Sequence, residues 1–211
     1  MDSATLQLTH WLSPAFPTGA FAYSHGLEQV IAQGAVSDAA SLEHWLSDVL
    51  HHGAGWQDAV LLALALAPDA EHDALDAMAQ ALQPSAERWQ ESTEQGAAFA
   101  RTVAQITASP QPPRALPIAV AQAARHLSAE PAQVIALYLQ GFATNLVTIA
   151  IRHVPLGQGE GHAVLSRLLR PIAALARRAA RAGLDDLGTA CLGADMAAME
   201  HETKQVRLFR T

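Results

Sequence analysis

Three histidines near residue 50 are the clearest candidates for metal chemistry in this sequence. His51 and His52 follow His44 by seven and eight residues, so all three could share one face of a helix. A metal site usually needs further ligands and a supporting layer of hydrogen bonds. Glu43 and Asp48 are near in sequence but do not clearly lie on that face. We therefore assign no metal site, and keep a helical metal-binding protein as the alternative hypothesis.

The residue types of nucleophilic catalysis are present without a recognisable arrangement. Ser24 and His25 are adjacent, but catalytic partners must meet in space rather than in sequence. Cys191, the single cysteine, excludes an intramolecular disulfide and lies in an apolar helical pattern, which predicts an inert core thiol. The run GQGEG at 157–161 lacks the Gly-Lys-Ser/Thr ending of a phosphate loop. We expect it to be a turn with positive φ angles at its glycines, and we expect no enzyme.

Five of the thirteen basic residues lie between residues 167 and 181. They are Arg167, Arg170, Arg177, Arg178 and Arg181. One interpretation is a solvated helix face with neighbouring acids, and the other is a docking patch for an acidic partner. The net charge of −7 and the lack of interleaved aromatic residues argue against a nucleic-acid partner.

The longest apolar stretch, residues 134–151, is interrupted by several polar residues, whereas a membrane span should be cleaner. It predicts a buried helix and no membrane association. The first ten residues lack the basic and apolar regions of a signal peptide. We therefore expect a cytoplasmic protein.

The elements that must position these residues are helices. Alanine dominates the chain and no segment alternates with a period of two, which predicts an all-α fold. We expect a single domain over residues 1–211, an antiparallel bundle of roughly eight to ten helices, with a flexible tail at about 202–211. Helices are expected at about 38–53, 58–67, 69–84, 86–108, 118–126, 128–152, 162–182 and 185–201. Ser128 is expected to cap one helix, and Pro171 to kink another.

The segment WLSPAFPTGAFAYSHGLE, residues 11–28, holds four aromatic residues in a chain that is 5% aromatic. Pro17 and Gly19 are expected to fix a turn. Phe21 and Tyr23 then offer a large contact area at low entropic cost. The segment could begin a core helix or present a surface to another protein, and we expect some positions to do each.

This segment resembles the N-terminal signature of the urease accessory protein UreF family, in which a Pro-x-Gly turn precedes Ser-x-Gly-Leu-Glu. Three later stretches agree in the same order, namely ESTEQGAAFAR at 91–101, PLGQGEG at 155–161 and HETKQVRLFRT at 201–211. The resemblance runs from about residue 5 to the last residue. The departures are local: Ala20, Gly159, His162, Lys204, Gln205 and Val206 replace residues that are commoner in the family.

The resemblance implies an all-α homodimer without catalytic activity or a cofactor of its own. Family members bind the accessory protein UreD, called UreH in some species, and with it recruit the GTPase UreG to urease apoprotein. Nickel is the cargo of that complex, and the family is credited with an internal passage for it. The implied partner-binding residues are Phe21, Tyr23, Ser24, Glu28, Arg207, Leu208 and Phe209. The implied structural turns lie at Pro17, Gly19, Gly26 and Gly157.

The family's tail becomes ordered when the complex forms, and its arginine shapes the surface that UreG meets. Here that arginine is Arg207. We expect Leu208 and Phe209 to anchor the tail in a groove while Arg207 bonds to carbonyl groups. A segment that orders on binding loses entropy at that moment, which makes binding conditional.

Overall fold

A computed structural model describes residues 3–211 and confirms the all-α prediction. These residues form ten α-helices and two 3-10 helices, without a strand among them. The α-helices are α1 (Ser3–Trp11), α2 (Leu27–Ala32), α3 (Ala39–His52), α4 (Ala54–Leu66), α5 (His72–Ala81), α6 (Ala86–Thr107), α7 (Leu116–Ala124), α8 (Pro131–His153), α9 (Gln158–Ala179) and α10 (Leu192–His201). The 3-10 helices are η1 (Ala20–Ala22) and η2 (Leu184–Asp186).

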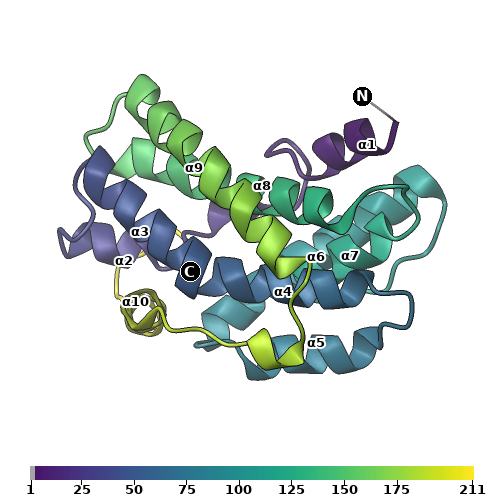
Figure 1. Ribbon diagram of the computed structural model, residues 1–211. Coiled ribbons are helices and arrows are strands. Elements are labelled where there is room, and N and C mark those ends of the chain that lie inside the picture. Colours follow the sequence, from purple (N-terminus) through teal and green to yellow (C-terminus); the bar gives the residue numbers. More distant parts are fainter. Residues whose placement is uncertain (1–2) are drawn as a thin grey trace.

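Helix α4 is the centre of the core. It packs against α3, α7, α8 and α9, and eight of its thirteen residues are buried. Helices α8 and α9 form a hairpin that crosses the upper part of the fold, while α10 lies at the opposite side beside α2 (Figure 1). The arrangement explains why α4 is apolar all round, since a helix with neighbours on every side has no solvent face.

Local signals placed several helix ends correctly. The Asp38 carboxylate accepts the Ser41 N–H at 2.8 Å and caps α3, as expected for an aspartate just before an apolar period. Gly53 ends α3 as predicted. The Ser85 hydroxyl accepts the Arg88 N–H at 3.2 Å at the start of α6.

Four predicted helix starts were wrong, among them that of α9, which begins at Gln158 rather than near residue 162. Helix α4 begins at Ala54, and Asp58 lies buried inside it, where its carboxylate accepts the Tyr138 hydroxyl at 2.6 Å. Ser128 does not cap α8, because Glu130 precedes the first helical residue. The last helix begins at Leu192 rather than near residue 185. Helix α1 was not predicted.

The Asp186 carboxylate accepts the Gly183 N–H at 2.8 Å, which closes the single turn of η2 instead of starting a long helix. Cys191 accordingly lies just before α10 and is only partly buried, so the expected core position was wrong. Pro171 lies inside α9, which continues through it to Ala179.

The glycine run at 157–161 does not form the predicted positive-φ turn. Gly157 has φ −69° and precedes α9, and its N–H donates to the Glu160 carboxylate at 2.8 Å. None of its glycines is among the residues with positive φ in the described chain. The run is a helix start, because the glutamate three residues on satisfies a free N–H.

One helix within residues 3–211, α8, is long and apolar enough to span a membrane by length and composition. Half of its most apolar window is buried in the fold. The buried core helices of soluble proteins also meet this criterion, so the length and composition of α8 are weak evidence for a membrane span.

Candidate partner-binding site

The tail after α10 contacts α2 and the first half of α6, and there it meets the opening segment. The Arg210 N–H donates to the Ala22 carbonyl at 2.9 Å, and the Ser24 N–H donates to the Thr211 carbonyl at 3.0 Å. The Ser24 hydroxyl donates to the same carbonyl. Two segments about 185 residues apart in sequence therefore form one site.

Charge pairs hold the tail along its length. Its basic residues recur every third position, and each one meets a glutamate of α2 or α6. The pairs are Lys204 with Glu28, Arg207 with Glu87, and Arg210 with Glu94. The glutamates of α6 lie seven residues apart and so share one helix face. Complementary spacing of opposite charges fixes where the tail lies.

Glu28 is the most heavily bonded group of the site. Its carboxylate accepts the Leu208 and Phe209 N–H groups at 3.1 and 3.0 Å. Lys204 Nζ and His201 Nε2 lie 3.0 and 3.2 Å from it. Burial raises the pKa of Glu28, but these donors outweigh burial and hold the pKa below its usual value. Glu28 is therefore ionised and ties the end of α10 to the tail.

A second buried carboxylate, Glu91, lies beneath the tail. It pairs with Arg88 and accepts the Thr211 hydroxyl at 2.8 Å. Burial raises its pKa, but Arg88 and His25 together outweigh burial and lower the pKa to about 2. His25 Nδ1 lies 3.5 Å from Glu91, yet burial and then Arg88 lower the pKa of His25 to about 4. His25 is thus neutral at pH 7, and this contact is not an ion pair there.

Tyr23 joins the opening segment to the charge pairs. Its hydroxyl donates to the Glu94 carboxylate, and Arg210 lies 3.0 Å from the phenol oxygen. Burial and the neighbouring Glu94 raise the pKa of Tyr23. The phenol therefore stays protonated and continues to donate.

The implied partner-binding residues fall into two groups. Tyr23, Ser24 and Glu28 are buried and hold the tail, whereas Phe21 and Leu208 are both 69% exposed. The expectation that Leu208 anchors the tail was wrong, because its side chain faces solvent.

The tail is anchored instead by Phe209, which packs on the core with its ring 5.0 Å from that of His153. Arg207 donates to the Lys204 carbonyl at 2.9 Å and to the Glu202 carbonyl. The arginine thus folds the tail back on itself while also pairing with α6.

Glycines shape the opening segment. Gly19 and Gly26 have φ +76° and +77°, a region that favours glycine. A Cβ on Gly26 would lie 3.1 Å from the Ala198 backbone nitrogen. Gly26 therefore lets the start of α2 approach α10, and the Thr18 N–H bonds to the Phe16 carbonyl across Pro17.

The three histidines of the alternative hypothesis do not form a ligand set. His44 is exposed and lies 3.5 Å from Asp48, while His51 Nδ1 lies 2.8 Å from the Ser47 carbonyl. No group of three or more His, Cys, Asp or Glu side chains within residues 3–211 could hold a metal ion. Nothing in this geometry favours the metal-binding alternative.

Comparison with known proteins gives the family of this chain. The family model described as UreF matches residues 36–169, more than half of the chain. The chain belongs to the UreF family of urease accessory proteins.

Full-length UreF relatives extend the match to the opening segment and the tail. The urease accessory protein UreF of Cereibacter sphaeroides (strain ATCC 17029) is 56% identical and aligns over all of both chains. That of Paracoccus denitrificans (strain Pd 1222) is 50% identical over this entire chain and 97% of its own. The UreF of Jannaschia sp. (strain CCS1) is 45% identical over 98% of this chain and 94% of its own.

Sequence reasoning on this UreF chain missed several residues, on the helices and in the tail itself, that hold the tail in place. They are Glu87, Arg88, Glu91, Glu94, His201, Arg210 and Thr211. A usable signal was present, since the glutamates 87, 91 and 94 recur with helical spacing and the tail cations recur every third residue. Pairing the two sets, however, required knowing that they meet.

Acidification is expected to weaken this UreF fold through His25. Its folded pKa of about 4 lies below the ordinary 6.5, so protonation favours the unfolded chain. Above pH 6.5, titration of His25 does not change the free energy of unfolding. As the pH falls from 6.5 toward 4, the free energy of unfolding decreases, by about 3 kcal/mol in the limit. Between pH 7 and pH 5, urea unfolding should show a larger loss of unfolding free energy for wild type than for His25→Asn, because asparagine has no titrating group. Asparagine is chosen because it tolerates the φ of +58° at this position. An NMR titration that places the His25 pKa above 6 contradicts this.

Proposed function

We propose that this chain is a non-enzymatic scaffold in urease maturation. With UreD/UreH it recruits the GTPase UreG to urease apoprotein and supports GTP-dependent nickel insertion. Full-length similarity to UreF proteins carries the proposal, together with a tail held by charge pairs against the opening segment. We further propose that it acts as a cytoplasmic homodimer, and that nickel is cargo rather than a resident cofactor.

The surface of the site suits a protein partner. Phe21, Leu208 and Val206 expose large apolar side chains on the opening segment and the tail. Arg207 lies beside them, with its guanidinium partly exposed. Exposed aromatic and arginine side chains supply much of the binding energy in protein interfaces. UreD/UreH and UreG are the proposed occupants of this surface.

The charge pairs make the tail a conditional part of that surface. Partly exposed ion pairs contribute only about 0.2–1 kcal/mol each, so a partner offering better contacts can displace or re-seat the tail. The buried Glu28 and the partly buried Phe209 keep one end of the tail fixed. Recruitment then depends on how the tail is positioned.

Arg207→Ala is expected to reduce UreG recruitment at least tenfold, because it removes both the ion pair with Glu87 and the bonds to tail carbonyls. The measurement is copurification of UreG with tagged protein in the presence of UreD/UreH. Arg101→Ala is the matched control, since Arg101 is exposed on α6 seven residues past Glu94 and, within residues 3–211, its side chain has no hydrogen bond or ion pair with the tail.

Removing residues 202–211 should abolish recruitment while circular dichroism shows the same helix content. Full recruitment after both changes would contradict the role of the tail. Failure of even the wild-type chain to retain UreD/UreH and UreG would contradict the scaffold itself.

A further inference from the structure

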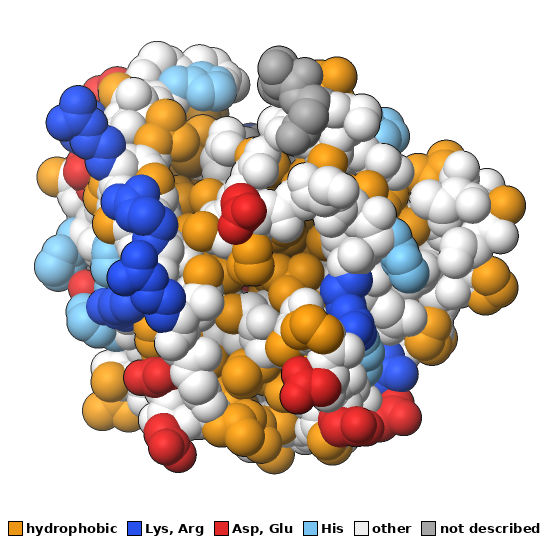
Figure 2. Space-filling model, turned by 45° about the vertical axis from the view of Figure 1, so that its right-hand side comes forward, with side chains coloured by type: hydrophobic (Ala, Val, Ile, Leu, Met, Phe, Trp, Pro, Cys, Tyr) orange, Lys and Arg blue, Asp and Glu red, His pale blue; other side chains and the backbone are white. Residues whose placement is uncertain are grey.

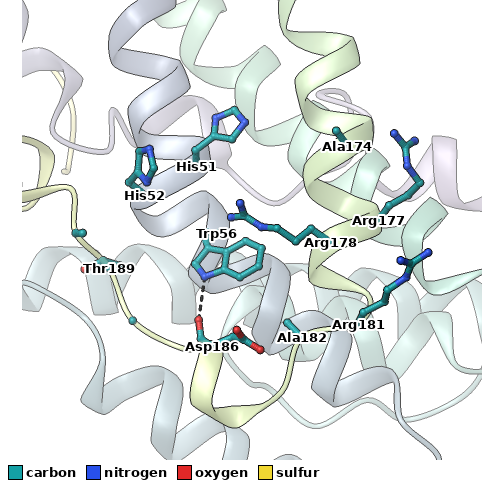
Figure 3. A pocket seen from close by; sticks show the side chains of 12 residues that line it. His51, His52, Trp56, Ala174, Arg177, Arg178, Arg181, Ala182, Asp186 and Thr189 are labelled. Carbon is teal, nitrogen blue, oxygen red and sulfur yellow. Dashed lines mark hydrogen bonds between the residues drawn. The ribbon is translucent and has the colours of Figure 1, made fainter.

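A second concave surface lies away from the tail, between the ends of α3 and α9. It has a volume of about 940 Å³ and is lined by the end of α3, the start of α4, the end of α9 and residues 186–190. The Ala190 N–H donates to the His52 carbonyl at 2.7 Å, and the Trp56 indole donates to the Asp186 carbonyl at 2.9 Å (Figure 3). These bonds hold the two walls together. We call this surface the arginine groove.

Arginines of α9 give the groove its charge. Arg178 reaches across it, with its guanidinium carbon 3.9 Å from the centre of the Trp56 ring, while Arg177 and Arg181 project from α9 at the rim (Figure 3). Stacking occupies the flat face of a guanidinium and leaves its N–H edge available. Within residues 3–211, the side chains of Arg177 and Arg181 have no hydrogen bond or ion pair.

Acids that line the groove do not balance this charge. Asp186 is the one acid among the lining residues, against three arginines. Arg167, farther along α9, does have a partner, since it pairs with Glu43 at 2.6 Å. The interpretation of a solvated helix face with neighbouring acids therefore holds for Arg167, but not for Arg177 or Arg181.

The positive charge of the arginine groove contrasts with the chain as a whole, which carries a net charge of −7. Basic side chains gather in a column at the left of the face in Figure 2, rather than being dispersed among acids. A local positive field on an acidic protein attracts a negatively charged partner and disfavours a basic one.

We propose that the arginine groove binds a carboxylate-rich segment of a partner protein. Guanidinium groups bind carboxylates through paired N–H donors, and three of them in one groove suit several carboxylates in succession. The volume is far larger than a single small anion needs and suits a short peptide segment. His51 and His52 on the opposite wall add further polar contacts. This surface is separate from the tail and goes beyond the proposed function.

The test uses the full-length chain and a fluorescein-labelled hexaglutamate peptide, followed by fluorescence anisotropy at low salt. Hexaglutamate should bind, and an uncharged hexaglutamine peptide should not. Arg177→Glu and Arg181→Glu should each weaken hexaglutamate binding at least fivefold. Arg101→Glu, which changes the net charge equally on exposed α6 surface, should stay within twofold of wild type. Both groove residues are exposed, and circular dichroism checks that the variants fold.

Several results would overturn the proposal. Wild type could fail to bind hexaglutamate, or Arg101→Glu could lose as much affinity as the groove variants. Inorganic phosphate at equal charge could displace the peptide as well as unlabelled hexaglutamate does, which would indicate a small-anion site. Vesicles of phosphatidylcholine with 30% phosphatidylserine could bind in place of the peptide, which would indicate a lipid surface. None of these outcomes affects UreG recruitment through the tail, which the copurification experiment measures separately.

Discussion

Gly96→Ala is expected to destabilise the fold by about 3 kcal/mol or to prevent folding altogether. A Cβ at this position would lie 1.9 Å from the Arg114 carbonyl oxygen and 2.8 Å from the Leu116 nitrogen. Both are backbone atoms, so no side-chain rotation relieves the clash. The segment before α7 cannot move away freely, because the Ala115 N–H is held by the Asp76 carboxylate at 2.7 Å. Urea unfolding followed by circular dichroism measures the loss.

Gly159→Ala is the matched control for that substitution. Gly159 lies in the first turn of α9, its φ is not positive, and a Cβ there would meet no atom within 4 Å. Alanine should be neutral or stabilise the helix by up to about 1 kcal/mol. An unfolding midpoint for Gly96→Ala equal to that of Gly159→Ala would show that α6 and α7 do not pack as described.

Glu28→Ala is expected to have the second large effect, a loss of about 3 kcal/mol together with release of the tail. The substitution leaves His201 with one carboxylate partner fewer and leaves Lys204 unpaired. It also strips the Leu208 and Phe209 N–H groups of their acceptor. Hydrogen exchange at these two amides should accelerate at least tenfold, and the unfolding midpoint should fall.

Glu130→Ala provides the comparison, since Glu130 is exposed and no side-chain bond involves it in the described part of the chain. It should change stability by no more than about 0.5 kcal/mol. If Glu28→Ala kept both its unfolding midpoint and the slow exchange of Leu208 and Phe209, Glu28 would not be what holds the tail.

Local signals predicted local structure well in this chain. Asp38 and Gly53 marked the two ends of α3, because capping depends on residues within a turn of each other. Asp58 has the same chemistry as Asp38 but lies inside α4, where burial raises its pKa to about 6 despite the bond from Tyr138. In the sequence, an aspartate that caps a helix looks the same as an aspartate that makes a buried hydrogen bond. Only the fold shows that the partner of Asp58 is Tyr138, 80 residues away.

The site shows the same division between short and long range. Gly19 and Gly26 were correctly expected at turns, since positive φ is a local requirement. Tyr23 was expected to offer contact area, yet it is buried, because its phenol donates to Glu94 and accepts from Arg210. The arginines of α9 could be counted from the sequence, but only the fold shows which of them have acidic partners.

The charge pairs of the tail have a consequence for its register. Glu87 and Glu94 are seven helical residues apart, which is about 10.5 Å along α6. Arg207 and Arg210 are three residues apart, and the tail bends at residues 208 and 209 between them. In this one bent conformation both arginines meet their glutamates together. A slip of the tail by one residue would move both arginines away from their glutamates at the same time. The tail therefore has a single bound position on α6 rather than several partly paired ones.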